Sequence, residues 1–259
     1  MKVSREEIET GALTTENLQF ALREMQDSGF VLLEQVLDRA YINQLNAAFQ
    51  KQFALHIQQP PLKDQIANGR IYVEMSAPFE PPYSDEQLCA NPLAVQVMGA
   101  AMGEIVCGFY NSNTAITGTE MQQIHIDMKR LLFPGFPVVL PAWSMVVNIP
   151  LIDFTEENGS TEVWPGTHLN SDDLNLDARY PSLHSIRMNA RVGDLIIRDL
   201  RVWHRGMPNQ TTAVRTMLAI VYNRPWLKLT RPPIQIPRTS WDNLSTHTQE
   251  IFKNNVIID

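Results

Sequence analysis

The sequence predicts an α+β fold with a mainly β core, in which N-terminal helices flank a sandwich or jelly roll. Helical patterns are concentrated before about residue 103 of the 259 residues, whereas strand-like segments dominate the rest. These strands follow one another without helices between them, which argues against an alternating βαβ sheet. No internal repeat or linker divides the chain, so we expect a single domain over residues 1–259.

The N-terminal part contains three predicted helices and two short strands. Leu18, Leu22 and Met25 recur at helical spacing, and Gly29 can end the first helix. Pro92 suits the first position of the third helix. The segments FVLL and RIYVEM are typical of strands. The predicted helices cover 15–28, begin at 38, and cover 92–103, and the strands cover 30–33 and 70–75.

Strand-like segments rich in β-branched and apolar residues fill the chain beyond residue 104. Turns rich in Gly, Pro and Asn separate them. The final segment, 228–259, is mixed and polar, and we expect its stretch PRTSWDNLSTHTQEIF (237–252) to end in a helix that packs on the outside. The predicted strands cover residues 104–110, 120–127, 143–152, 187–192, 194–199 and 216–222.

Composition favours a soluble cytoplasmic protein with a small-molecule partner. The formal net charge of −7 argues against nucleic acid and anionic membranes, which both favour basic surfaces. Only two cysteines are present, Cys89 and Cys107, so no disulfide framework is expected. The polar, acidic N-terminus is not a secretory signal, and no apolar run is as long as a membrane span. A monomer or a homodimer is expected.

A histidine and an aspartate alternate in the segment QIHIDMKR. On the predicted strand 120–127, His125 and Asp127 point to the same face, because side chains alternate with period two. His204 follows the apolar strand 194–199. Two imidazoles and one carboxylate form the three-ligand face of non-haem iron(II) oxygenases. A surface His–Asp pair, and a rim histidine bonded to backbone, are the alternative readings of these residues.

Several stretches in order resemble the phytanoyl-CoA dioxygenase family of iron(II)/2-oxoglutarate oxygenases. HID at 125–127 is followed 77 residues later by His204, and Arg215 comes eleven residues after that. ENGSTEVWPGTH (157–168) is similar to the family's Asn-Gly…Pro-Gly-Ser-His turn. VGDLIIRDLRVWHRGMPN (192–209) and SGFVLLEQVLD (28–38) also resemble family segments. Any one match is weak, but together they span roughly residues 15–222.

The resemblance implies a double-stranded β-helix, or jelly roll, that holds Fe(II) with His125, Asp127 and His204. Arg215 would bind the distal carboxylate of 2-oxoglutarate, because its planar fork matches a carboxylate. Gln122 and Thr161 resemble residues that contact this cosubstrate. With O2, such an enzyme oxidises an unactivated C–H bond and releases succinate and CO2. Hydroxylation is the usual outcome, and the carboxylate of Asp127 argues against halogenation.

The long, proline-rich segment 57–90 is a predicted lid and specificity element. Its apolar and aromatic residues favour a small, largely apolar substrate, such as a natural-product or secondary-metabolite intermediate. Met128 lies beside the predicted metal strand and could line a substrate pocket. Arg70 could add a contact to the cosubstrate from the preceding hairpin. The segment's residues expected to face substrate are Tyr72, Met75, Phe79 and Tyr83.

Two other functions fit the same residues. The first is a cupin-like metalloenzyme that uses a metal without a cosubstrate. The second is a catalytically silent metal-binding protein on the same fold. The intact triad and Arg215 argue against the silent protein, because such a protein would be expected to lose at least one of them. An Arg215→Ala change separates the other two functions, since it should cripple cosubstrate binding in a 2-oxoglutarate enzyme and be nearly neutral in the cupin-like enzyme.

Overall fold

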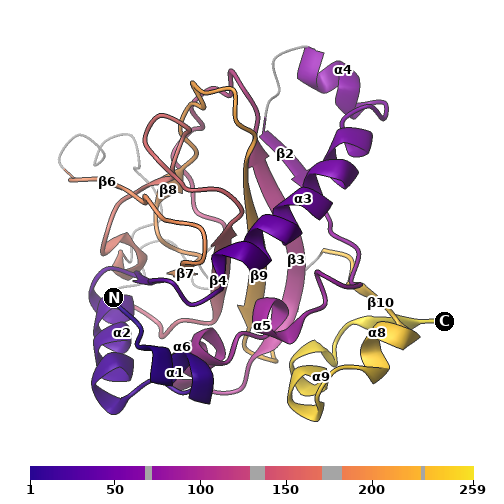
Figure 1. Cartoon of the computed structure of the whole chain (residues 1–259). Coiled ribbons are helices and arrows are strands. Elements are labelled where there is room, and N and C mark those ends of the chain that lie inside the picture. Colours follow the sequence, from indigo (N-terminus) through magenta and orange to yellow (C-terminus); the bar gives the residue numbers. More distant parts are fainter. Residues whose placement is uncertain (68–71, 129–137, 171–182, 229–230) are drawn as a thin grey trace.

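The structure, a computed structural model, describes residues 1–67, 72–128, 138–170, 183–228 and 231–259. Within them the chain forms a mixed helix and strand fold around a large antiparallel sheet (Figure 1). The sheet has six strands in the order β1-β7-β4-β9-β3-β2, and each neighbouring pair is antiparallel. These strands are β1 (Phe30–Leu33), β2 (Tyr72–Met75), β3 (Val106–Ala115), β4 (Ser144–Pro150), β7 (Leu195–Asp199) and β9 (Arg215–Asn223).

The helices lie mainly in the N-terminal part and at the C-terminus (Figure 1). The Asp38 side chain caps α3 by accepting from Tyr41 N at 2.9 Å, and Asn91 caps α6 ahead of Pro92. The predicted first three helices are therefore confirmed. The helices are α1 (Arg5–Thr10), α2 (Thr15–Asp27), α3 (Arg39–His56), α4 (Leu62–Ala67), α5 (Glu86–Cys89), α6 (Pro92–Met102), α8 (Arg238–Asp242) and α9 (Thr246–Phe252).

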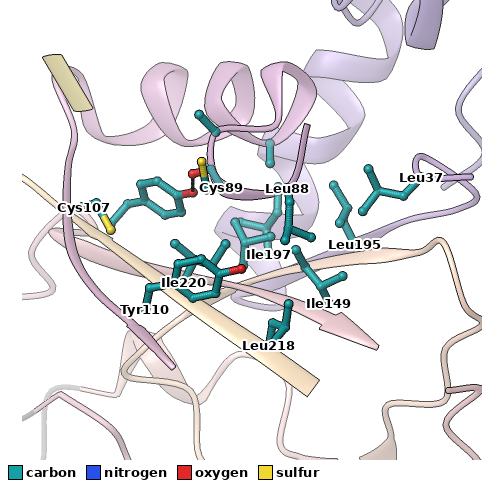
Figure 2. Packing of buried hydrophobic residues seen from close by; sticks show 14 of the residues in the cluster. Leu37, Leu88, Cys89, Cys107, Tyr110, Ile149, Leu195, Ile197, Leu218 and Ile220 are labelled. Atoms are coloured by element: carbon teal, nitrogen blue, oxygen red, sulfur yellow. Dashed lines mark hydrogen bonds between the residues drawn. The ribbon is translucent and has the colours of Figure 1, made fainter. Parts of the chain in front are cut away.

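The large sheet packs one face against the helices. Along β9, Leu218 and Ile220 join the main apolar core with Ile149 and Ile197 from neighbouring strands. Figure 2 shows these side chains projecting from the sheet toward the helical layer. Buried residues of α2, α3 and α6 complete this core. Because strand side chains alternate, the residues between them point to the opposite face of the sheet.

A second, three-stranded sheet covers part of that opposite face. Its order is β6-β5-β8, with β5 (Glu162–Val163) between β6 (Ile186–Arg187) and β8 (His204–Arg205). Val163 of β5 packs in one buried cluster with Ile196 of β7 and Leu32 of β1. The small sheet thus faces the large one. Near the C-terminus, β10 (Gln235–Pro237) pairs in parallel with β11 (Val256–Ile258). No helix of the described residues has the length and apolarity that a membrane span requires.

Two sequence-based expectations are wrong. The segment 120–127 is not a strand, because it makes only an isolated bridge at His125 with His204. The strand expected over 187–192 is limited to β6. The helix predicted at the end of residues 237–252 is confirmed as α9, although the C-terminal segment also forms α8, β10 and β11. The polar helices α1, α4 and α5 were not anticipated.

Candidate active site

A cavity of about 420 Å³ opens on the face of the large sheet opposite the helices. Its walls come from β2, β3, β4, β7 and β9, from β8 of the small sheet, and from residues 122–128. The two sheets therefore position the side chains of this cavity, although the segment that carries His125 and Asp127 has no strand of its own.

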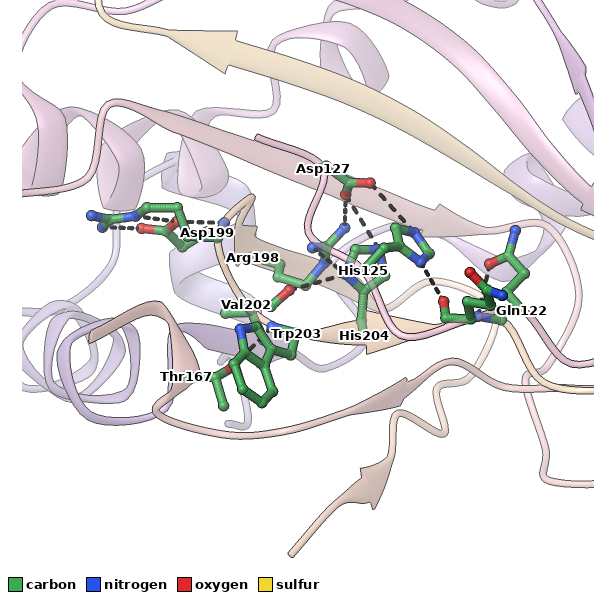
Figure 3. A network of polar contacts seen from close by, with 12 residues as sticks. Gln122, His125, Asp127, Thr167, Arg198, Asp199, Val202, Trp203 and His204 are labelled. Atoms are coloured by element: carbon green, nitrogen blue, oxygen red, sulfur yellow. Dashed lines mark hydrogen bonds and ion pairs between the residues drawn. The ribbon is translucent and has the colours of Figure 1, made fainter. Parts of the chain in front are cut away.

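The structure brings His125, Asp127 and His204 together at one end of this cavity (Figure 3). His125 and His204 exchange two backbone hydrogen bonds of 3.0 Å each, which sets their rings side by side. Asp127 Oδ2 lies 3.4 Å from His204 Nε2, and Oδ1 lies 3.8 Å from His125 Nε2. One possible ligand atom from each residue lies within 4.8 Å of the others. This arrangement suits one ion shared by two imidazoles and a carboxylate.

Backbone carbonyl groups orient both imidazoles. Nδ1 of His125 lies 2.8 Å from the carbonyl oxygen of Gln123, and Nδ1 of His204 lies 3.0 Å from that of Val202. A proton on each Nδ1 makes these contacts hydrogen bonds and leaves both Nε2 atoms free to coordinate a metal. This is the tautomer that coordination through Nε2 requires.

Arg198 of β7 lies directly beside these residues, and sequence reasoning missed it. Its side chain is nearly fully buried, and Nη2 donates to Asp127 Oδ2 at 2.6 Å. Nη1 lies 3.2 Å from His204 Nδ1. Since the Nδ1 proton points to Val202, we interpret this contact as a nearby positive charge and not as a hydrogen bond. A charged residue inside the apolar strand LIIRD was the available sequence signal.

Charge and burial shift the pKa values of two of the candidate ligands, Asp127 and His204. Burial opposes ionisation of Asp127, but His204 and the Arg198 guanidinium outweigh it and hold the pKa of this carboxyl well below its usual range. Burial, followed by the charge of Arg198, lowers the pKa of His204. Both shifts favour the metal-binding forms, an ionised carboxylate and a neutral imidazole.

Arg215 supplies a buried cation to the same cavity. It begins β9, and only 1% of its surface is exposed. Its Nε and Nη1 atoms have no hydrogen-bond partner among the described residues. The Phe154 ring lies 5.0 Å from the guanidinium, and burial lowers the pKa of Arg215. A buried cation with unpartnered donors suits an anionic ligand with two acceptor oxygens, such as a carboxylate.

The polar residues that line the cavity along with Arg215 include Tyr72, Thr161 and Gln122. The Tyr72 hydroxyl donates to Met207 O at 2.9 Å, and Gln122 Oε1 accepts from Gly206 N at 2.8 Å. A side chain at position 206 would collide with Tyr72, so the glycine permits this close approach. The amide nitrogen of Gln122 remains available to a ligand in the cavity.

The other part of the cavity is apolar. Four side chains, from β4, β9 and the turn after β7, form a buried cluster, and two partly buried side chains pack on it. At its edge the Arg231 guanidinium stacks 4.3 Å from the Phe109 ring and lies 3.4 Å from Glu74. This apolar cluster consists of Val146, Leu200, Ala219 and Val221, with Phe109 and Met128 packed against it.

Only some of the residues predicted to contact substrate line the cavity. Tyr72 and Met128 line it. Met75 does not, because it lies on the other face of β2 and is buried in the main core. Phe79 and Tyr83 are buried in that core as well. Of the described residues of segment 57–90, Tyr72 and Glu74 line the cavity, and Arg70 lies outside the described residues.

Comparisons with known proteins agree with this architecture. The model of the phytanoyl-CoA dioxygenase family matches residues 25–217. Dioxygenase af480 of Aspergillus fumigatus is 26% identical over 254 residues, covering 92% of this chain and 77% of the relative. Two solved structures share the fold. The carbocyclase SnoK from nogalamycin biosynthesis has a TM-score of 0.59 and 18% identity, covering 82% of this chain and 84% of its own. The epimerase SnoN, in complex with Fe3+, alpha ketoglutarate and nogalamycin RO, has a TM-score of 0.60 and 14% identity, covering 81% and 84%.

Proposed function

The chain belongs to the phytanoyl-CoA dioxygenase family, and from this premise we propose that it oxidises an unactivated C–H bond of a small, largely apolar molecule, usually by hydroxylation. It is a non-haem iron(II)- and 2-oxoglutarate-dependent dioxygenase. We further infer that its two facing sheets are the two layers of a double-stranded β-helix. The substrate is a natural-product or secondary-metabolite intermediate.

Arg215 carries this proposal, because two of its guanidinium nitrogen atoms lack a hydrogen-bond partner among the described residues and it lies in the same cavity as the three candidate metal ligands. His125, Asp127 and His204 would hold Fe(II). Bound iron, with O2 and 2-oxoglutarate, supplies the oxidising power to break the C–H bond, with release of succinate and CO2. Arg215 would anchor the distal carboxylate of 2-oxoglutarate, while Thr161 and Gln122 would contact the cosubstrate from the cavity wall.

The apolar cluster supports an apolar substrate. It lines the cavity that also contains Asp127, so it would hold the skeleton of a substrate near the iron. Burying such a skeleton against Val146 and Val221 favours binding by about 25 cal/mol for each Å² removed from water. The same contact excludes water from the site. Access would be controlled near Tyr72 and Glu74, the part of the proposed lid segment that lines the cavity.

Anaerobic titration of the apo-protein with Fe(II) and then 2-oxoglutarate tests this function. The visible charge-transfer band of chelated 2-oxoglutarate should appear in the wild type and be lost or weakened in His204→Ala and Arg215→Ala. A metal-loaded wild type without the band would refute the oxygenase function and favour a metalloenzyme without cosubstrate. Slow decarboxylation of 2-oxoglutarate by the wild type would exclude a catalytically silent protein.

A further inference from the structure

Arg198 is a charged residue that directly follows three apolar residues in the buried strand β7. It is the fourth of the five residues of β7, and the two residues before it, Ile196 and Ile197, are buried in two apolar clusters. Only 4% of Arg198 is exposed. Burying an unpaired guanidinium would cost several kcal/mol, so the contacts of its donors indicate its role.

Those contacts are with the candidate metal ligands. Nη2 donates to Asp127 Oδ2 at 2.6 Å, a short charge-assisted hydrogen bond (Figure 3). Nη1 lies 3.2 Å from His204 Nδ1. In the figure the Arg198 side chain reaches from β7 to a point between these two residues. A single side chain from the rigid sheet therefore contacts two of the three ligands.

Asp127 needs such a contact more than the two histidines do. His125 and His204 exchange backbone hydrogen bonds, and a carbonyl group orients each ring. Asp127 is tied to the sheet through the backbone bond from its N to Leu200 O, and its side chain is 36% exposed. The described structure contains one ordinary hydrogen bond to this carboxylate, the one from Arg198.

We propose that Arg198 is a positioning residue that holds Oδ2 of Asp127 and thereby makes the carboxylate bind iron through Oδ1 alone. This rests on the proposed function, in which iron occupies the site. A carboxylate that binds through one oxygen leaves more of the metal's face open to cosubstrate and O2. The guanidinium also places a fixed positive charge beside the metal, which favours the ferrous over the ferric ion.

The test uses the whole chain and two replacements, Arg198→Met and Arg198→Lys. Arg201→Met is the matched control. Arg201 is equally buried and pairs with Asp199 at 2.6 Å, but it does not line the cavity. Thermal unfolding of each apo-protein identifies a variant that fails to fold. If Arg198→Met fails to fold, Arg198→Lys, which keeps the charge but loses the planar fork, carries the test.

The first readout is the affinity of the apo-protein for Co(II). We expect Arg198→Met to weaken it about 10- to 100-fold, as lost contacts to metal ligands commonly do, with a smaller loss in Arg198→Lys. Removing the positive charge would by itself tighten metal binding, so weaker binding reports lost orientation. The visible spectrum of bound Co(II), which depends on coordination number, should also change in Arg198→Met. Arg201→Met should match the wild type in both respects.

The second readout is the Fe(III)/Fe(II) equilibrium in a mediated redox titration. We expect Arg198→Met to shift it about tenfold toward the ferric form, or about 59 mV for one electron. Folded Arg198 variants with wild-type Co(II) affinity, spectrum and redox equilibrium would refute the positioning role while leaving the proposed function intact. A wild type that binds neither Co(II) nor Fe(II) would refute the proposed function and this inference with it.

Discussion

Replacing Arg215 by methionine should make the free protein more stable and remove tight binding of 2-oxoglutarate. Methionine has a similar length and no charge. In the free protein, Arg215 is 1% exposed and keeps two nitrogen atoms without a hydrogen-bond partner among the described residues. Each unsatisfied buried group costs about 1–3 kcal/mol. The Phe154 ring recovers part of this, roughly 0.5–2 kcal/mol.

Two such groups together cost about 2–6 kcal/mol, so the expected gain in unfolding free energy is centred at about 3 kcal/mol. For a protein of this size, that raises the unfolding temperature by roughly 6–12 °C. Binding changes in the opposite direction. Two charge-assisted hydrogen bonds to a carboxylate contribute about 1.5–3 kcal/mol each. Their loss should weaken 2-oxoglutarate binding by about 10²- to 10⁴-fold.

Differential scanning calorimetry measures both effects on the Co(II)-loaded protein, with and without 2-oxoglutarate. The wild type should unfold at a higher temperature with the cosubstrate, whereas Arg215→Met should start higher and respond little. Arg215→Lys, which keeps the charge, should lie between them. If Arg215→Met is destabilised and still binds 2-oxoglutarate as tightly as the wild type, the assignment of this buried cation to the cosubstrate is wrong.

Three further predictions concern the turn, the core and pH. Gly159 has a φ of +84°, and a side chain there would meet the backbone of residues 207–208, so Gly159→Ala should lower the unfolding free energy by about 1–3 kcal/mol in urea titrations. The control for this substitution is Gly99→Ala, in a helix with free space around it, which should be neutral or stabilising by up to about 1 kcal/mol. Phe79 is 1% exposed with its ring centroid 4.8 Å from that of Phe252, so Phe79→Ala should destabilise by about 3–5 kcal/mol, and an unchanged urea midpoint would contradict its core position. Burial lowers the pKa of His204 below its ordinary 6.5, so below that pH the folded apo-protein binds fewer protons than the unfolded chain. The unfolding free energy should therefore fall as the pH drops from about 6.5 through the folded pKa. In His204→Gln, the contribution of this group to the pH dependence of stability should be absent.

The helices and strands were predicted best where the hydrophobic periodicity and the capping residues indicated the same element. The helices after Asp38 and Asn91, and the apolar strands β4, β7 and β9, lie close to their predicted bounds. The segment 120–127 was misassigned because its alternating pattern satisfies a strand, whereas its actual bonds are isolated ones to residues around β8. Whether such a segment forms a strand depends on its pairing with a segment about 80 residues further along the chain, and a local sequence pattern contains no information about that pairing.

The candidate metal site was predicted because a histidine, an aspartate and a second histidine in this order along a chain are typical of iron(II) oxygenases. Two histidines and an aspartate with metal-ligand chemistry could be found by resemblance, and the structure brings them together. The prediction that Met75 contacts substrate is wrong, because side chains alternate between the two faces of a strand. Tyr72 and Met75 are three residues apart on one strand, so they must face opposite sides of the sheet. Arg198 was missed although a charge inside LIIRD is unusual.

The charges of the cavity also suggest an order of binding. Arg198 and Arg215 are both buried on its wall, and Asp127 compensates one of them. Adding a divalent ion makes the cavity more positive, which strengthens its attraction for a dianion such as 2-oxoglutarate. Once that dianion is bound, most of the excess charge is compensated, and the apolar cluster remains as the surface from which a substrate can displace water. We therefore expect metal, then cosubstrate, then substrate, and substrate binding before 2-oxoglutarate in equilibrium titrations would contradict this account.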